Sequence, residues 1–397
     1  SASWFRLRRA VEVSAHRMED HRGFHPGLLD GGGAGEGAQA TGTDYSRRDL
    51  FWKARVNRLD AMRGDILVLR ETEIRRLLDP ASCRVAVEEA FSAYATGGAV
   101  MPGVINLDLP EQGGEVHVKA GYLRGGGFYA VKLASGFPGN RARGLPAGDG
   151  MVLVFDAATG SPAALLLDNG LLTDLRTGAA GAVAAGHLSR RDSRVVGVVG
   201  CGVQARCQLE ALAQVRPFRE ARIWGRDPER ARACASEMAG RPGMSGKCRF
   251  RTASSVREAV AGADIVVTVT ASREPLVRAE WLQPGVHVTA VGSDGPEKRE
   301  LFPEVLARAD RLVADSLAQC LRLGEIHHAV AAGAITERDV DAELGEITAG
   351  RKPGRQNDLE ITVCDLTGLG VQDVAAAALV MERARAGREK LGTLLSP

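Results

Sequence analysis

The feature that most constrains the fold is an uninterrupted apolar run that ends in closely spaced glycines and continues into a helical pattern. Val195–Val199 forms the run, and it is followed by Gly200-Cys201-Gly202-Val203-Gln204-Ala205. A run without polar alternation is typical of a strand buried on both faces of a parallel sheet. Glycines in this strand–turn–helix context allow a tight turn and a close approach of the backbone to a pyrophosphate, and Ala205 lets the helix pack on the strand. The pattern predicts dinucleotide binding at a helix N-terminus by Gly200, Gly202, Val203, Gln204 and Ala205.

The rest of this region alternates between short apolar strands and helical segments. We predict further strands over Ala221–Trp224, Ile265–Thr270, Val286–Val291 and Arg311–Ala314. Such alternation favours a doubly wound parallel sheet, and we place this Rossmann domain at residues 189–316. The carboxyl ends of its strands are where such sheets bind ligands. We therefore also expect cofactor contacts from Thr268, Thr270, Val291 and Gly292.

Two flanking segments form a second unit. Residues 62–188 contain helical spacing over Glu71–Thr96, several strand-like runs separated by Gly, Pro and Asn turns, and an alanine-rich helix over Leu172–Leu188. Residues 317–397 end in a predicted helix, Asp373–Leu391, which would most simply return to cover the first segment. We therefore predict an α/β fold in which the Rossmann domain is inserted in a composite α/β domain.

Residues 1–61 differ from the rest, because they are rich in arginine and contain the glycine run Gly31–Ala38. We interpret them as a flexible, dispensable extension, with a targeting segment or an ordered accessory segment as alternatives. The chain has a net charge of +2 and no long basic block, which argues against binding to nucleic acid or to an anionic membrane. No apolar window is long enough to predict a membrane span. Cysteines without a CxxC pair predict reduced thiols, no metal site and a cytoplasmic location.

The end of the second predicted strand bears on the choice of cofactor. A ribose-binding acid normally ends this strand, but here Gly225 and Arg226 occupy that place. A small residue followed by arginine suits a 2′-phosphate, because the guanidinium can pair with it. Asp227 could contact the ribose hydroxyls or cap the helix that begins at Pro228, and the Asp-Pro order favours capping. We favour NADP(H), with NAD(H) as the alternative.

Three further segments place charged side chains where chemistry is expected. Lys132 ends an apolar strand before a glycine/proline turn, so it either lines a site or extends along the strand surface. Arg176 lies among small residues near a helix start and could hold a carboxylate, or pair with Asp168 or Asp174. Asp294 follows a parallel strand beside glycines, where open α/β sheets bind ligands, although aspartate also forms turns there.

Together these segments resemble the ornithine cyclodeaminase/mu-crystallin family. The matching motifs are a lysine strand with its turn, an arginine helix and an acid loop, at Lys132–Asn140, Thr173–Ala180 and Ala290–Leu301. They occur in the family order within about residues 64–390, and their wording is closest to the ectoine-utilisation cyclodeaminases. The resemblance implies that the composite domain, at 62–188 and 317–397, binds substrate and dimerises. It also implies a homodimer and a small amino or imino acid as substrate.

The resemblance further implies roles for single residues. Lys132 and Arg176 would bind the substrate α-carboxylate and polarise the imine. Asp294 would be the general acid/base on the substrate nitrogen. These roles suit hydride transfer from Cα, which needs a clamped carboxylate and a deprotonated amine, because an ammonium has no lone pair.

One departure from the family pattern concerns the carboxylate ligands. An arginine in a PxR stretch of the family is replaced here by Gly103. Lys119 is the predicted substitute, because strand alternation places it on one face with Glu115; the alternative is an exposed strand lysine. His327 and His328 are expected to cap a helix or to have another structural role.

Three functions are compatible with this set of residues. The first is a cyclodeaminase, which oxidises an amino or diamino acid at Cα, releases ammonia and returns the hydride to a cyclic imine. The second is an imine or ketimine reductase, or an amino-acid dehydrogenase of the alanine dehydrogenase kind. The third is a catalytically idle NADP(H)-binding protein of the mu-crystallin kind. The first is favoured, and net turnover of NAD(P)H separates it from the second.

Overall fold

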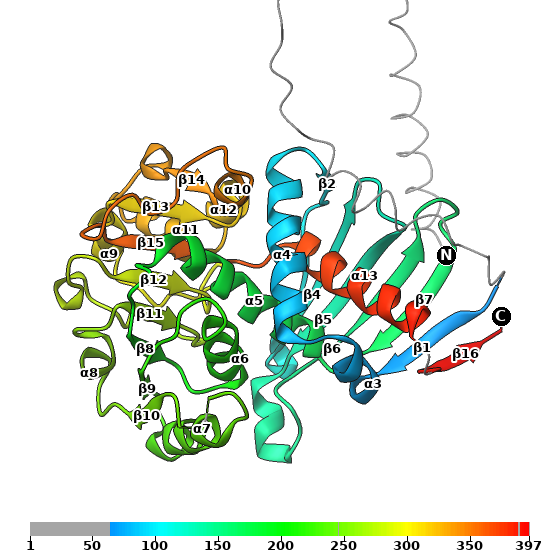
Figure 1. Cartoon of the computed structure of the whole chain (residues 1–397), viewed down its shortest axis with the longest axis horizontal. Coiled ribbons are helices and arrows are strands. Elements are labelled where there is room, and N and C mark those ends of the chain that lie inside the picture. The colour runs from blue at the N-terminus through cyan, green and yellow to red at the C-terminus, as the bar shows by residue number, and fades with distance from the viewer. Residues whose placement is uncertain (1–63, 245, 388–389, 397) are drawn as a thin grey trace, which may run out of the picture. The chain divides into compact units, whose positions relative to one another are not determined.

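The computed structural model describes residues 64–244, 246–387 and 390–396 (Figure 1). The prediction for residues 1–61 lies outside this part of the chain. Two eight-stranded sheets account for the strands of the described residues. Within this part, no helix is long and apolar enough to cross a membrane.

The first sheet has the order β16-β1-β7-β6-β5-β4-β2, with β3 paired to β4. All of its pairs are antiparallel except β1 with β7. Its strands are β1 (Ile66–Arg70), β2 (Ala99–Val100), β3 (Ile105–Leu109), β4 (Gly114–Leu123), β5 (Phe128–Gly136), β6 (Gly148–Asp156), β7 (Pro162–Leu167) and β16 (Thr393–Leu395).

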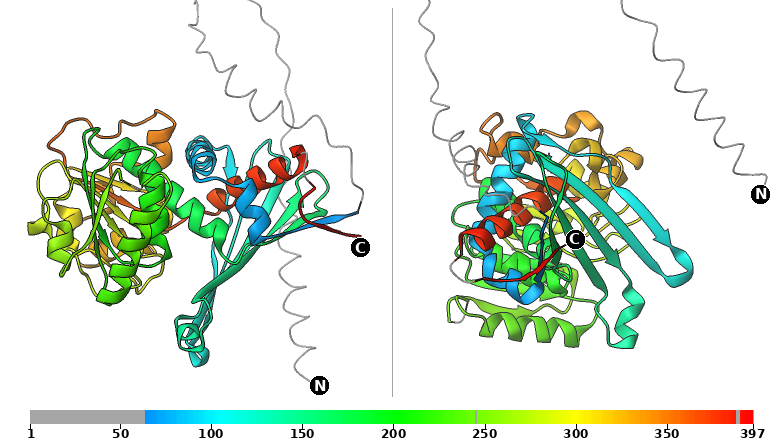
Figure 2. Two further views of the ribbon diagram at one scale, coloured as in Figure 1. Left: turned by 60° about the horizontal axis from the view of Figure 1, so that its bottom comes forward. Right: turned by 90° about the vertical axis from the view of Figure 1, so that its right-hand side faces the viewer.

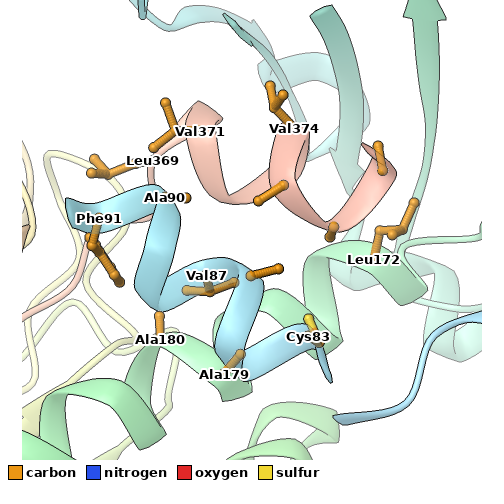
Figure 3. Close-up of a cluster of buried hydrophobic side chains, with 14 of the residues drawn as sticks. Cys83, Val87, Ala90, Phe91, Leu172, Ala179, Ala180, Leu369, Val371 and Val374 are labelled. Atoms are coloured by element: carbon orange, nitrogen blue, oxygen red, sulfur yellow. The ribbon is translucent and has the colours of Figure 1, made fainter. Parts of the chain in front are cut away.

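Helices cover one face of this sheet. They are α3 (Glu71–Leu77), α4 (Pro80–Ala95), α5 (Leu171–Leu188) and α13 (Gly370–Ala386). Figure 2 shows α4 in blue and α13 in red on the same side of the sheet, and α13 packs on β4 and β5. Figure 3 shows the core where α4, α5 and α13 meet, with Phe91, Leu172 and Val374 buried among small side chains. The predicted return of the terminal helix to the first segment is confirmed.

The end of the terminal helix differs from the prediction. We expected the helix to continue to Leu391, but it ends at Ala386. The cause is local, because Gly387 leaves the helical conformation at φ −68° and ψ 144°. The chain then forms the short strand β16, which pairs antiparallel with β1.

The second sheet is parallel throughout, with the order β10-β9-β8-β11-β12-β15-β13-β14. Its strands are β8 (Val195–Val199), β9 (Glu220–Trp224), β10 (Arg249–Thr252), β11 (Ile265–Thr268), β12 (His287–Ala290), β13 (Arg311–Ala314), β14 (Ala342–Glu343) and β15 (Thr362–Asp365). Its helices are α6 (Val203–Leu212), α7 (Pro228–Gly240), α8 (Val256–Val260), α9 (Pro303–Ala307), α10 (Leu317–Cys320), α11 (Gly324–Ala331) and α12 (Leu344–Thr348).

The alternation of strands and helices confirms the predicted fold class. The sheet nevertheless continues past residue 316, where we placed the end of the Rossmann domain. β15 lies between β12 and β13, and β14 pairs with β13 at the edge. The limits of the domains stay a proposal, and by strand pairing the Rossmann sheet includes residues up to Asp365.

Candidate functional site

Two lysines lie opposite each other on the covered face of the first sheet. The register of β4 and β5 pairs Lys119 directly with Lys132. The Lys132 side chain is only 3% exposed. Arg176, which comes from the first turns of α5, is also buried. The structure thus brings together three of the cations that the sequence singled out.

Asp373 of α13 is the carboxylate at the centre of this cluster. The ammonium of Lys132 lies 3.0 Å from Oδ2 of Asp373, and Nε of Arg176 lies 2.9 Å from Oδ1. The guanidinium also donates to Oε1 of Gln372 at 2.8 Å. Burial raises the pKa of Asp373, but Arg176 and Lys132 more than offset it, so the pKa lies below its usual range. Asp373 was not predicted as a site residue; its signal was an acid in the first turn of a helix that carries no other charge before Glu382.

Positive charge exceeds negative charge in this cluster. Lys119 donates to the carbonyls of Gly368, at 2.8 Å, and Thr367, at 3.3 Å, rather than to a carboxylate. Burial, followed by the charge of Arg176, lowers the pKa of Lys132 to about 7. Three cations around one carboxylate form a place where an anion would be stabilised, since a buried charge without a partner is costly.

Gly368 lets these groups approach one another. Its φ is +82°, and a Cβ there would lie 2.7 Å from the Arg176 guanidinium. The backbone of Gly368 can therefore lie against Arg176 while its carbonyl accepts from Lys119. Gly103, where the family arginine is absent, lies between β2 and β3, and a Cβ there would meet nothing within 4 Å.

Asp294 follows β12 and carries an ion pair with a nearby lysine. Its Oδ1 lies 2.8 Å from Nζ of Lys298, and the same Nζ lies 3.0 Å from Oε1 of Glu115 on β4. Burial raises the pKa of Asp294, but Lys298, Lys119 and His117 together hold it below its usual range. The Asp294 side chain is half exposed, and Lys298 connects it to β4, the strand that carries Lys119. Neither Lys298 nor its pairing with Glu115 was recognised in the sequence.

The glycine-rich turn after β8 has the conformation that a pyrophosphate site needs. Gly200 has φ +124°, and a Cβ there would lie 2.8 Å from the carbonyl of Val269. A Cβ on Gly202 would meet nothing within 4 Å, and no side chain caps α6 at this residue. The first N–H groups of α6 are therefore free of a side-chain cap, as anion binding requires. Val203 is 53% exposed beside them. These residues fit a dinucleotide.

Two other residues of this turn pack inward. Ala205 is fully buried, as close packing of α6 on β8 requires. Gln204 donates to Oδ1 of Asp174 at 2.9 Å. Asp174 is thus bound by Gln204, and Arg176 forms its ion pair with Asp373 instead.

At the end of β9, Asp227 has the capping role that was one of its two predicted alternatives. Its Oδ1 accepts from the backbone of Glu229 at 3.0 Å and of Arg230 at 3.4 Å, so it caps α7. Arg226 is exposed. A Cβ on Gly225 would lie 2.4 Å from Sγ of Cys201, so an acid here would need Cys201 to move.

Glu300 ties the ends of β11 and β12 together. Its carboxylate accepts from the backbone of Thr270 and, at 2.8 Å, from that of Gly292. Thr268 ends β11, and Val291 follows β12. Burial raises the pKa of Glu300 to about 7. The sequence reasoning expected the four neighbours as cofactor contacts but missed this buried acid.

The two histidines after Glu325 make backbone contacts. Nε2 of His328 donates to the carbonyl of Lys298 at 2.9 Å, and Nδ1 of His327 donates to that of Leu321 at 3.3 Å. Both contacts agree with the structural role that we expected.

Comparisons with known proteins identify relatives of the whole described region. The chain is 51% identical to a putative dehydrogenase of Rhizobium meliloti, over 80% of this chain and 96% of that protein. It is 48% identical to an uncharacterised cyclodeaminase of Sinorhizobium fredii, over 80% and 95%.

Two solved structures match at similar coverage. An archaeal alanine dehydrogenase dimer with bound NAD has a TM-score of 0.77 and 37% identity, over 83% of this chain and 99% of that one. The Δ1-pyrroline-2-carboxylate reductase of Thermococcus litoralis, in complex with NADH and L-proline, has a TM-score of 0.78 and 35% identity, again over 83% and 99%. The model of the ornithine cyclodeaminase/mu-crystallin family matches residues 64–388. The chain therefore belongs to the ornithine cyclodeaminase/mu-crystallin family, whose relatives here include NAD(H)-binding enzymes of small amino and imino acids.

Proposed function

We propose that this protein transfers a hydride between NAD(P) and Cα of a small α-amino or α-imino acid. One observation carries the proposal: the buried cations Lys132 and Arg176 share the single carboxylate of Asp373, and the half-buried Lys119 lies opposite Lys132. Lys298 connects Asp294 to β4, the strand that carries Lys119. An α-carboxylate would supply the missing negative charge, and its Cα and nitrogen would then lie near Asp294. Alanine dehydrogenase and Δ1-pyrroline-2-carboxylate reductase, two relatives of this chain, act on substrates of this class.

The charges of the site residues indicate their roles in the proposed reaction. Lys119, Lys132 and Arg176 bind and orient the substrate carboxylate, because each offers N–H donors that a carboxylate accepts. Asp294 accepts a proton from the substrate ammonium. The freed lone pair then forms the C=N bond as the C–H bond breaks. A dinucleotide whose pyrophosphate is held at the glycine turn, by Gly200, Gly202 and the first N–H groups of α6, would supply the hydride acceptor or donor. In the reverse direction, Asp294 returns the proton to nitrogen.

Binding of a carboxylate ligand is expected to weaken as the pH rises through about 7. Lys132 carries its proton below this pKa and loses it above, and a carboxylate binds the charged form. Calorimetry with L-proline, L-alanine and L-ornithine, in two buffers of different ionisation enthalpy, should show proton uptake at pH 8. The Lys132→Met variant should lose this uptake. Uptake that is equal in the variant would contradict the assignment.

Two outcomes can follow the imine, and each has support. The wording of the motifs and the 48% identical cyclodeaminase favour return of the hydride after ammonia is released. The solved alanine dehydrogenase and pyrroline-2-carboxylate reductase favour a net redox reaction. We propose the cyclodeaminase course first, as the motifs indicate, and the net redox course second.

A single assay separates these courses. The purified protein is incubated with NADP+ or NAD+ and with ornithine, lysine, diaminobutyrate, alanine or proline, while ammonia and the absorbance of NAD(P)H are followed together. Ammonia and a cyclic amino acid without net NAD(P)H establish the cyclodeaminase. Net NAD(P)H formation establishes the redox course. If neither ammonia nor NAD(P)H forms, and NAD(P)H is not consumed in the reverse direction with keto acids plus ammonium, the result would instead indicate a binding protein.

For the cofactor we propose NADP(H), on the strength of Arg226. The Arg226→Ala variant is expected to bind NADPH about 10-fold or more weaker, because a charge-assisted hydrogen bond to the 2′-phosphate is lost. Its affinity for NADH should not change. Fluorescence titration of both cofactors measures this, with Arg232→Ala, an exposed arginine of α7, as the control. Equal losses for both cofactors, or a wild-type preference for NADH, would favour NAD(H).

We also propose a homodimer, formed through the uncovered face of the first sheet. Strand alternation and register place a continuous set of apolar side chains on the face opposite α13: Ile105, Leu107, Val116, Val118, Leu133, Met151, Leu153 and Phe155. Exposed apolar patches of this kind mark interfaces. The alanine dehydrogenase in the solved structure is a dimer.

Met151→Glu is expected to convert the dimer to a monomer. The carboxylate would be buried without a partner in the apolar face. Light scattering after size-exclusion chromatography gives the mass directly. Leu359→Glu is the matched control, because Leu359 is 72% exposed and lies outside this sheet. A dimer that survives the Met151 substitution would place the interface elsewhere.

A further inference from the structure

The acid loop contains a second charged residue whose side chain joins the two sheets. Lys298 lies 2.8 Å from Asp294 in its own loop and 3.0 Å from Glu115 on β4. Resting on the function proposed above, we propose that Lys298 is a positioning residue that holds Asp294 in place and passes to Glu115 when Asp294 engages the substrate nitrogen.

The backbone of Lys298 is fixed, so only its side chain is free to move. The N–H of Lys298 donates to the carbonyl of Gly295 at 3.1 Å, which closes a turn. Its own carbonyl accepts from Nε2 of His328 at 2.9 Å and from the hydroxyl of Ser293. Ser293 is buried and His328 is half-buried, and neither takes part in the proposed chemistry. Their contacts with the Lys298 carbonyl give both a role, which is to hold the backbone of Lys298.

The charges around Lys298 favour an ammonium shared by two carboxylates. Burial lowers the pKa of Lys298, but Asp294 and Glu115 raise it well above its usual range. The imidazole of His117, whose Nε2 lies 3.7 Å from Oε2 of Glu115, and the ammonium of Lys298 together lower the pKa of Glu115 to about 2. Lys119 and His117 are the other groups whose charges act on Asp294. Lys298 therefore remains charged, and both acids remain ionised, throughout the neutral range.

This arrangement addresses a difficulty in the proposed reaction. A carboxylate that is held by an ammonium is a weak base, so Asp294 must release Lys298 before it can take a proton from the substrate. An ammonium that leaves its only partner in a partly desolvated place is destabilised. Glu115 removes this cost, because it already contacts the same Nζ. The exchange is therefore a small shift of one side chain between two acids.

The test uses two substitutions with opposite expected effects on pH dependence. In the pH profile of kcat/KM for amine oxidation, the fall at low pH, called the acid limb, reports the protonation of Asp294 in the substrate-free enzyme. Lys298→Met removes the neighbouring cation, so this limb is expected to move up by about one pH unit. Glu115→Gln leaves Lys298 with Asp294 alone, so the limb is expected to move down. Lys298→Arg should restore the limb of the wild type.

A lysine ion pair elsewhere provides the matched control. Lys352 lies 2.9 Å from Glu346, and Lys352→Met should leave the limb unchanged. If Lys298→Met and Glu115→Gln lower kcat without moving the limb, or move it in the same direction, the proposal is overturned and Lys298 is only structural.

A measurement without turnover separates this proposal from the proposed function. If the wild type acts on none of the amino acids, the proposed function fails, and the melting temperature of Lys298→Met is compared with that of the wild type across pH. A lowered folded pKa of Asp294 stabilises the wild type above the unfolded pKa of about 3.9, and this is lost as the pH falls. The deficit of Lys298→Met should therefore be present at pH 7 and shrink toward pH 3. A deficit that does not depend on pH would refute the proposal.

Discussion

Asp294→Asn is expected to lower kcat by about 10²–10⁴-fold, the range for loss of a general acid or base. Asparagine keeps the size of the side chain and can still accept from Lys298, so the loop should retain its conformation. It cannot accept a proton from an ammonium or return one to an imine. The affinity for NAD(P)H should not change, because the glycine turn lies after a different strand, β8.

The design of this test separates chemistry from folding. Steady-state rates are compared in both directions, and the affinity for NAD(P)H is measured on the same preparations. Asp339→Asn is the control, because Asp339 is an exposed aspartate that caps a short turn at Thr336. A variant that keeps kcat within about tenfold of the wild type would show that another group moves the proton. A parallel loss of cofactor affinity would show that the substitution disturbs the fold.

Local patterns predicted most of the elements that surround this site. The strand Val195–Val199 agrees with the sequence analysis, and the alanine-rich helix begins at Leu171, one residue before the predicted start. An apolar run and alanine-rich spacing are properties of neighbouring residues. The glycine turn at Gly200–Ala205 was also predicted from the sequence, because a tight turn and a close packing contact each require a particular residue at one position. β16 is three residues long and exposed, and such a short edge strand leaves almost no pattern.

The partners of the charged residues could not be predicted in the same way. Strand alternation placed Lys119 on one face with Glu115, but its position opposite Lys132 depends on the register of two strands. Asp373 and Lys132 are separated by 241 positions. Only the packing of α13 on the sheet brings them together. Pairing of this kind is a property of the fold, whereas the sequence alone identified Lys132 as a candidate site residue.

The strand order of the second sheet likewise could not be predicted from local sequence patterns. β15 has four residues and lies between β12 and β13, although β13 precedes it in the chain. The sequence analysis predicted no strand in the stretch that contains β15. A strand that lies between two earlier strands of the chain depends on long-range pairing. The four residues of β15 do not themselves indicate which strands they pair with.

Asp373→Asn is expected to lower the free energy of unfolding by about 3–5 kcal/mol, the range for removal of one partner from a buried ion pair. The Asp373 carboxylate lies within 3.0 Å of Lys132 and 2.9 Å of Arg176, and all three side chains are buried. Asparagine fills nearly the same volume, so the loss would come from charge rather than from a cavity. Chemical denaturation at pH 6 measures it. Glu297→Gln removes a pair of equal length that is exposed, and should cost about 0–1 kcal/mol.

The loss of stability in Asp373→Asn is expected to depend on pH. The pKa of Asp373 is lowered by folding, so its contribution is present above the unfolded pKa and is lost as the pH falls. Lys132 has a pKa of about 7, so above pH 7 it can become neutral. Of the two cations that pair with Asp373, only Arg176 then remains charged. The deficit of Asp373→Asn should therefore be larger at pH 6 than at pH 9. The double variant Lys132→Met/Asp373→Asn should recover part of the stability, because one of the two stranded cations is gone.

A ligand should repair the same defect. If the substrate carboxylate completes the charge balance of the cluster, then millimolar L-proline or L-alanine should raise the melting temperature of Asp373→Asn more than that of the wild type. In the variant the carboxylate meets three cations with no competing acid, so its electrostatic gain is greater. Equal shifts in both proteins would mean that the ligand binds away from Lys132 and Arg176. A deficit at pH 6 no larger than that of Glu297→Gln would mean that the cations are solvated, and the charge argument for an anionic substrate would fail with it.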